Sequence, residues 1–385
     1  IPLRLVGSEM CIRDRYYRIQ ISPEDCTGCG LCQEICPALG KALILKEAKK
    51  VLETEKSNLE KVEKLKKLTK TPFSKATTKG LQFEKNYFSF PGACAGCGET
   101  PYIKLASMLF GNKMVIANAT GCSSIYGGSY PSCPFAKDDN GRGPAWANSL
   151  FEDNAEFGLG IKLAKQKQNS SESVWIIGGD GWAYDIGFGG LDHVLASGAN
   201  VNILVLDNEC YANTGGQASK ATPAGAAVKL ADGGKETCKK NLGLMAMTYG
   251  NVYVASVALG ANMNQCIKAF REAEAYNGPS LIIAYCTCVN HGFEMSKSLT
   301  EMRKAVEAGY VMLYRYHPKE GFTLDRGEIN NKFLPFLLGE RRYAYLNERE
   351  SERAKKLFKK SKEKINENYI SYKSLERTSG KNKGD

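Results

Sequence analysis

The sequence predicts an α/β protein whose main part is a doubly wound, mostly parallel sheet. Short apolar runs without polar alternation recur from residue 91 onward, helical patterns separate them, and Gly-rich turns follow several of them. Strands that are apolar on both faces are usually buried by helices on both sides of a parallel sheet. The expected strands are Met114–Asn118, Val174–Ile177, Asn202–Leu206, Val252–Val257 and Leu281–Tyr285, and the expected helices are Tyr102–Leu109, Phe151–Lys167, Phe188–Ala196, Thr237–Tyr249 and Asn262–Tyr276.

Changes in composition divide the 385 residues into five predicted parts. Residues 1–15 fit nothing that follows and are interpreted as an unmatched leader, an artefact of assembly or expression. Residues 16–45 form a small cysteine-rich unit, and residues 46–90 form a charged helical linker. Residues 91–316 form the α/β domain, and residues 317–385 form a polar, helical C-terminal arm.

Composition and charge favour a globular protein with a sizeable core. Apolar residues make up 43% and charged residues 24% of the chain. Much of the net charge of +11 lies in Lys-rich stretches interleaved with Glu, a pattern typical of solvated helix faces rather than of nucleic-acid binding. A basic surface that attracts an acidic redox protein is the weaker alternative. No apolar run approaches the roughly 20 residues of a membrane span, so neither nucleic acid nor membrane is an expected partner.

The first chemical motif is a run of closely spaced cysteines at Cys26, Cys29, Cys32 and Cys36, followed by Pro37. This spacing is that of bacterial ferredoxins, in which three cysteines of a run bind one 4Fe–4S cluster and the fourth binds the other cluster. Because one run is present, residues 16–45 are predicted to be half of a two-cluster ferredoxin-like domain. Thiolate clusters indicate a reducing compartment, either the cytoplasm or an anaerobic organelle such as a hydrogenosome.

A second motif follows two of the expected strands. Gly179-Asp180-Gly181 follows the strand ending at Ile177, and Asp207-Asn208 follows the strand ending at Leu206. Ligands of open α/β sheets bind at the carboxyl ends of the strands. The Asp180 carboxylate, the Asn208 amide oxygen and a nearby backbone carbonyl would suit Mg²⁺ bound to a diphosphate, and the spacing matches the thiamine diphosphate signature. The alternative is that Gly-Asp-Gly is a plain turn.

Four further cysteines form the third motif. Cys94 and Cys97 make a C-x-x-C pair, which alone fits zinc, a redox dithiol or an iron–sulfur cluster. Cys122 and Cys288 each follow an expected strand and therefore point to the sheet edge that carries Asp180. Elsewhere, the expected small core residues are Cys133, Cys238, Cys266 and Cys286. His193 is expected to be a structural histidine and His317 a surface residue. His291 follows Cys288 closely, and the sequence favours neither a place in the cluster pocket nor a place outside it.

Long stretches of the chain resemble pyruvate:ferredoxin (flavodoxin) oxidoreductase, in its C-terminal portion. The residues that carry the resemblance are Gly92–Tyr102, Gly121–Gly128, Gly143–Gly160 and Gly178–Pro223, and the resemblance extends over about Tyr16 to Tyr316. It implies oxidative decarboxylation of pyruvate with coenzyme A to acetyl-CoA and CO₂, with electrons passing through 4Fe–4S clusters to ferredoxin or flavodoxin. It also implies a homodimer, and N-terminal domains that supply the pyrimidine half of the thiamine site and a second cysteine run, without which this chain would be inactive.

The resemblance also implies roles for individual residues. Cys94, Cys97, Cys122 and Cys288 would hold a 4Fe–4S cluster, while Asp180, Asn208 and the Cys210 carbonyl would hold Mg²⁺; the family usually has Thr at the position of Asn208. Glu99 and Asn213 would be catalytic, with Asn213 near the 2-oxoacid. The cofactor contacts would be Glu99, Cys122, Gly179, Asp180, Gly181, Trp182, Asn208, Glu209, Cys210, Tyr211, Ala212 and Asn213.

Two alternatives to this function remain open from the sequence. The first is a 2-oxoacid:ferredoxin oxidoreductase with another substrate, such as 2-oxoglutarate or an aryl pyruvate. The second is an electron-transfer module in which an iron–sulfur unit is fused to a domain without catalysis. The complete set of Asp180, Asn208 and Asn213 favours thiamine chemistry over the second alternative.

Overall fold

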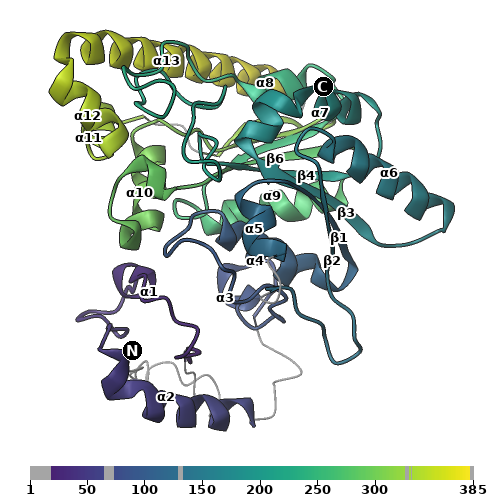
Figure 1. Ribbon diagram of the computed structural model, residues 1–385. Helices are drawn as coiled ribbons and strands as arrows, with labels where there is room; N and C mark the ends of the chain where they lie inside the picture. The colour runs from purple at the N-terminus through teal and green to yellow at the C-terminus, as the bar shows by residue number, and fades with distance from the viewer. Residues whose placement is uncertain (1–18, 65–72, 129–132, 326–328, 331, 382–385) are drawn as a thin grey trace.

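The protein is described by a computed structural model covering residues 19–64, 73–128, 133–325, 329–330 and 332–381 (Figure 1). The predicted leader at residues 1–15 lies outside these ranges. No helix in the described ranges is long and apolar enough to cross a membrane.

The centre of the molecule is an eight-stranded sheet with the order β2-β1-β3-β4-β6-β5-β7-β8. Its first six strands in this order are parallel, as the apolar runs predict, and β7 and β8 are antiparallel. The predicted α/β class is confirmed. The five expected strands are β1 (Met114–Ala119), β3 (Ser173–Gly179), β4 (Asn202–Asp207), β5 (Tyr253–Val257) and β6 (Ser280–Tyr285).

Three strands were not expected, because none of them has a buried apolar run. β2 (Ala145–Ser149) lies at one edge of the sheet and is partly exposed along its length. β7 (Tyr314–His317) and β8 (Gly321–Leu324) form an antiparallel pair at the opposite edge. The sheet therefore continues past residue 316, where the predicted arm begins.

Helices cover both faces of the sheet, and each face has its own apolar core. One core includes residues of α4 (Thr100–Phe110), α9 (Met263–Ala275) and α10 (Ser298–Glu307). The other core includes residues of α6 (Asn154–Lys167), α7 (Phe188–Ala196) and α8 (Leu242–Met247).

The helix expected at Thr237–Tyr249 is shorter than predicted. It begins at Leu242, because the Asn241 side chain accepts a hydrogen bond from the Leu244 amide at 3.0 Å and caps the helix there. Residues 237–240 are therefore loop.

The C-terminal segment packs on the domain instead of forming a free arm. Helix α13 (Ser351–Lys381) follows α11 (Phe333–Leu338) and α12 (Arg341–Arg349) and runs along the top of the domain in Figure 1. Tyr372 is buried, with ring centroids 4.9 Å from Tyr314 and 5.5 Å from Phe322. The predicted division of the chain into domains is otherwise not tested and stays a prediction.

The N-terminal unit lies on one side of the α/β domain (Figure 1). It contains α1 (Leu31–Glu34) and α2 (Ala48–Glu63), and α2 falls within the predicted charged linker. Helix α3 (Thr78–Leu81) follows, and Leu81 is buried in the core. The cysteine loop approaches the turn η5 (Met295–Lys297), where a Cβ added to Gly30 would lie 3.1 Å from the Ser296 Cβ.

Candidate thiamine diphosphate and cluster site

A cavity of about 240 Å³ opens where β1, β3 and β4 end. Ten of the twelve residues predicted to contact the cofactor line it. Glu209 and Trp182 do not, because Glu209 points to the other side of its loop and the Trp182 ring packs against Gly178 and Gly187 in the core. The predicted residues on the wall are Glu99, Cys122, Gly179, Asp180, Gly181, Asn208, Cys210, Tyr211, Ala212 and Asn213, joined by Thr120, Gly121, Ser123, Phe151 and Thr214.

Asp180 presents a carboxylate oxygen suited to a cation. It directly follows β3 and is 1% exposed. Oδ2 accepts a hydrogen bond from the Ser219 hydroxyl, whereas Oδ1 is buried and has no hydrogen-bond partner among the described residues. Burial, and then the neighbouring Asp207 carboxylate, raise the pKa of Asp180 well above its ordinary value. A divalent cation would offset both effects, so Asp180 fits the Mg²⁺ ligand predicted from the sequence.

Asn208 lies across the cavity, after β4. Its Nδ2 donates to a Glu99 carboxylate oxygen, and its Oδ1 accepts from the Cys210 amide at 3.3 Å. Asn208 and Cys210 thus lie on the cavity wall together with Asp180. The donor set is composed of hard oxygens, which Mg²⁺ prefers.

Glu99 connects the cavity to the cysteines. It follows Cys97 by two residues, is 4% exposed, and accepts a hydrogen bond from the Tyr126 hydroxyl at 3.0 Å. Burial, and then the negative charge of Cys288, raise the pKa of Glu99 to about 7, despite its hydrogen bonds from Asn208 and Tyr126. This carboxyl can therefore hold or release a proton near neutral pH.

The four cysteines from three separate segments interact with one another. Cys94 and Cys97 share a turn, closed by a 3.0 Å hydrogen bond from the Cys97 amide to the Cys94 carbonyl. The Gly98 amide donates to the Thr287 carbonyl at 3.0 Å, which brings this turn beside Cys288. Burial is the main cause that raises the pKa of Cys122, and Glu99, Cys288, Cys97 and Cys94 each add to it. The other three cysteines thus all lie near enough to Cys122 to affect its ionisation.

The number of these thiols matches the four corners of an iron–sulfur cube. In the described ranges, no three His, Cys, Asp or Glu side chains converge on a position for one metal ion. An iron–sulfur cube is a larger body that takes one thiolate at each corner. A hydrogen bond from Cys210, the largest cause, lowers the pKa of Cys288 to about 6, which favours the thiolate form that ligation needs.

The ferredoxin-like run forms a second, local group of cysteines. Burial is the largest cause that raises the pKa of Cys32, and Cys29 and Cys26 add to it. The Cys36 sulfur instead accepts a hydrogen bond from the Ala42 amide at 3.3 Å. This grouping fits three ligands of one cluster and one ligand of another.

Comparison with known proteins identifies both modules. Residues 120–284 match the family described as "Thiamine pyrophosphate enzyme, C-terminal TPP binding domain", and residues 19–39 match "4Fe-4S binding domain". The chain is 48% identical to the pyruvate:ferredoxin oxidoreductase of Moorella thermoacetica, with 93% of this chain and 37% of the relative aligned. It is 46% identical to the pyruvate-flavodoxin oxidoreductase of Klebsiella pneumoniae, with 94% of this chain and 37% of that protein aligned.

The chain is related over nearly its whole length to the pyruvate:ferredoxin (flavodoxin) oxidoreductases. The resemblance seen in the sequence is therefore confirmed, as are a thiamine diphosphate-binding domain and a 4Fe–4S-binding domain. The chain spans about 37% of the length of these relatives. A solved structure of 2-oxoglutarate:ferredoxin oxidoreductase from Magnetococcus marinus aligns with 59% of the chain and 72% of its own chain, at 20% identity and a TM-score of 0.44, too low to establish a shared fold by itself.

Several other predictions about this oxidoreductase-related chain can be compared with the structure. Cys266 and Cys286 are core residues as predicted, but Cys133 is exposed and Cys238 is half-buried, so for these two the prediction was wrong. Cys133 follows β1 and α5 in a surface loop, and Cys238 lies in the loop that replaces the expected helix start. His193 is exposed on α7, whereas His291 is fully buried beside Asn208.

Several site residues were not expected from the sequence. Ser219 and Tyr126 both lie in segments that carry the family resemblance, so a search for hydroxyl partners of Asp180 and Glu99 would have flagged them. Lys239 and Arg342 form ion pairs with buried carboxylates behind the site. Neither belongs to a recognisable motif, and Arg342 is far in sequence from its partner Glu209.

Proposed function

We propose that this chain carries the thiamine diphosphate and electron-relay centres of a pyruvate:ferredoxin or pyruvate:flavodoxin oxidoreductase. The reaction would be the oxidative decarboxylation of pyruvate with coenzyme A to acetyl-CoA and CO₂. The observation that supports this most strongly is the shared position of Cys122. It lines the cofactor cavity and also interacts with the other three cysteines, so a cluster held there would adjoin the cofactor.

Asp180, Asn208 and the Cys210 carbonyl would hold Mg²⁺ and, through it, the diphosphate. Gly181 gives the backbone room, because a Cβ at this position would lie 2.5 Å from the Tyr211 ring. The Tyr211 hydroxyl in turn donates to the Gly181 carbonyl at 3.3 Å and fixes the turn. When bound, thiamine diphosphate supplies the electron sink for decarboxylation of a 2-oxoacid.

Glu99 and Asn213 are the residues proposed to act at the reaction centre. Glu99 keeps a proton available inside the cavity, since its pKa is about 7. Asn213 lies on the cavity wall after the Asp207–Cys210 turn and offers an amide to a polar substrate group. Their positions on opposite segments allow both to face one bound substrate.

The placement of the cysteine run supports onward electron transfer. A Cβ on Gly30, next to Cys29, would lie 3.1 Å from the Ser296 Cβ, and a Cβ on Gly96, next to Cys97, would lie 2.5 Å from the Met295 carbonyl oxygen. The two cysteine loops are thus separated by two residues of one turn. Electrons would pass from the core cluster through this turn to the ferredoxin-like unit, and then to ferredoxin or flavodoxin.

The parts of the reaction without a site in this chain belong to the rest of a longer protein. We infer that the pyrimidine half of the thiamine site, the second cysteine run and the residues that select the 2-oxoacid lie there. Binding of coenzyme A, a homodimeric assembly and a location in the cytoplasm or an anaerobic organelle are parts of the same proposal.

The proposal is tested by titrating thiamine diphosphate into the complete protein with and without Mg²⁺. Asp180→Ala should weaken Mg²⁺-dependent binding by at least about 100-fold, because a ligand to the ion is lost. Asp139→Ala removes an exposed carboxylate away from the cavity and should leave the affinity unchanged. Equal affinity of wild type and Asp180→Ala in calorimetry would refute the assignment.

A further inference from the structure

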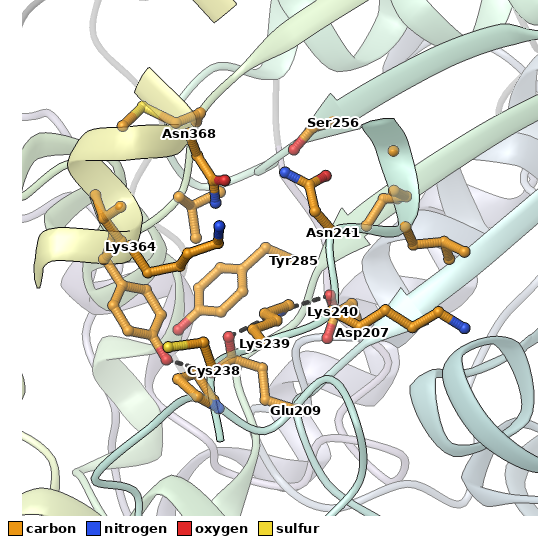
Figure 2. A pocket seen from close by; sticks show the side chains of 18 of the residues that line it. Asp207, Glu209, Cys238, Lys239, Lys240, Asn241, Ser256, Tyr285, Lys364 and Asn368 are labelled. Carbon is orange, nitrogen blue, oxygen red and sulfur yellow. Dashed lines mark hydrogen bonds and ion pairs between the residues drawn. The ribbon is translucent and has the colours of Figure 1, made fainter. Parts of the chain in front are cut away.

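The turn that follows β4 presents its side chains to two different cavities. Asn208 and Cys210 face the cofactor cavity, whereas Asp207 and Glu209 face a second cavity of about 130 Å³ on the other side of the turn. Figure 2 shows this second cavity, with Lys239 between Asp207 and Glu209. The side chains behind the turn are therefore placed to control its shape.

Glu209 has a backbone conformation that needs external support. Its φ is +65°, in the left-handed region that residues with a Cβ seldom adopt. Such a conformation is strained and persists where surrounding contacts enforce it. The flanking residues Asn208 and Cys210 are the proposed Mg²⁺ ligands, so the shape of this one residue affects both.

Buried ionic contacts supply that support. Glu209 is 1% exposed, and its Oε1 accepts from the Lys239 ammonium at 2.9 Å. Its Oε2 accepts from Arg342 Nη2 at 2.7 Å and from the Tyr310 hydroxyl at 2.6 Å. Every oxygen of the Glu209 carboxylate is thus directed away from the cofactor cavity and fixed.

Arg342 also connects to the other side of the turn. Its Nε donates to Glu340 Oε2 at 2.7 Å, and Glu340 Oε1 lies 3.5 Å from His291 Nδ1. The opposite ring nitrogen of His291 is 2.9 Å from the Asn208 carbonyl oxygen. The helix that carries Arg342 is itself held in place, since the Arg342 carbonyl accepts from the Ala227 amide at 2.8 Å and the Arg341 amide donates to the Gly292 carbonyl at 3.1 Å.

We propose that Arg342 is a positioning residue for the cofactor site: it fixes Glu209 directly and Asn208 through Glu340 and His291, so that the Asp207–Cys210 turn presents its oxygens to Mg²⁺. This inference rests on the proposed binding of thiamine diphosphate. It assigns to α12, far along the chain, a role in a site whose other known parts precede residue 300. Arg342 does not line the cofactor cavity, and it acts on that cavity through the turn.

Removal of the guanidinium would leave the buried Glu340 carboxylate without its cation and Glu209 with Lys239 as its remaining cation. Glu209 would then lose the contact that holds its Oε2, and the strained turn would relax. Because the outer partners of metal ligands typically contribute 10–100-fold to metal affinity, a loss of this size is expected here. The loss should appear as a higher Mg²⁺ requirement.

The neighbouring residue provides a matched control. Arg341 precedes Arg342 on α12 but is solvent-exposed and pairs with Glu348 on the surface at 2.7 Å. Arg342→Met and Arg341→Met are therefore compared in the complete protein, each titrated with Mg²⁺ at fixed thiamine diphosphate by calorimetry. Thermal unfolding and iron content are measured on the same samples to separate a local effect from a global one.

We expect Arg342→Met to raise the Mg²⁺ concentration for half-maximal cofactor binding about 10–100-fold, and Arg341→Met to change it by less than about twofold. Arg342→Lys keeps a buried cation but has a single ammonium for two carboxylates, so about a tenfold weakening is expected. If Arg342→Met does not fold, the Mg²⁺ requirement of Arg342→Lys tests the proposal instead.

Two results would overturn the proposal, and they are distinguishable. If the wild type binds thiamine diphosphate and a folded Arg342 variant has the same Mg²⁺ requirement as Arg341→Met, Arg342 does not position the turn. If the wild type itself shows no saturable, Mg²⁺-dependent binding, the proposed function fails and this inference fails with it.

Discussion

The two groups of cysteines in this molecule are built in opposite ways. The ferredoxin-like group, Cys26 to Cys36, comes from one contiguous run of the chain. The core group combines Cys94 and Cys97 with Cys122 and Cys288, which lie in separate segments joined by the sheet. The first group depends on local turns, and the second depends on the whole α/β fold.

This difference predicts how far a disturbance should spread. A change in the contiguous run can be absorbed by a short exposed loop. A change in the core group should affect both a cluster and the cofactor cavity. Cys122 and Glu99 line the cavity and also lie near the other core cysteines. Three experiments test the comparison, in decreasing order of expected effect.

The largest effect is expected for Cys122→Ala in the complete protein. Loss of one corner ligand should remove the core cluster, so that the iron content falls by about four atoms per chain. The activity should be lost with the cluster. Cys36→Ala should leave the core cluster in place, because Cys36 belongs to the local group. Iron and sulfide assays with electron paramagnetic resonance measure both; undiminished cluster content in Cys122→Ala would contradict the ligand assignment.

A smaller effect is expected for Gly98→Ala, which tests whether the core group depends on close packing between segments. The added Cβ would lie 2.5 Å from the Thr287 amide nitrogen and push Cys97 away from Cys288. Overpacking of this kind costs about 1–3 kcal/mol, so the core cluster should be lost faster to an iron chelator. In Gly92→Ala the Cβ would meet nothing within 4 Å, and chelation rates equal in the two variants would rule out the packing argument.

The smallest effect concerns the charge of Glu99 in the cofactor-free and cluster-free protein. Because its pKa is raised to about 7, Glu99 should be neutral below pH 7 and ionised above it. An infrared band of a neutral carboxyl should therefore disappear with a midpoint near pH 7 and be missing in Glu99→Gln. Cys288→Ala removes a nearby negative charge and should lower the midpoint, while Cys29→Ala should not; an equal response to both would mean that the core group is not coupled to the cavity.

Much of the parallel sheet was predictable from the sequence, because its strands are continuous apolar runs. The Gly-Asp-Gly and Asp-Asn segments were also identifiable, since they follow directly from such strands. The edge strands β2, β7 and β8 were not predictable in this way, because partly exposed strands carry mixed residues. The packing of α13 was hidden for a different reason: its many Lys and Glu residues suggested a solvated arm, although Ala354, Leu357, Phe358 and Ser361 form a buried stripe at helical spacing.

The support behind the site could not be predicted from spacing at all. Glu209 is a charged residue in a Gly-rich segment, and nothing in the sequence indicates its left-handed φ or its partner Arg342. Lys239 lay in a stretch expected to be helical, where a lysine would normally be solvated. Buried ion pairs between distant segments become visible only when the fold brings them together.

The assembly of the core cysteines from distant segments also has a consequence for maturation. Cys94 and Cys288 become neighbours only after β6 has joined the sheet, whereas Cys26 to Cys36 lie in one short segment. Under the proposed ligand assignment, iron should therefore enter the core site only on chains whose sheet has formed.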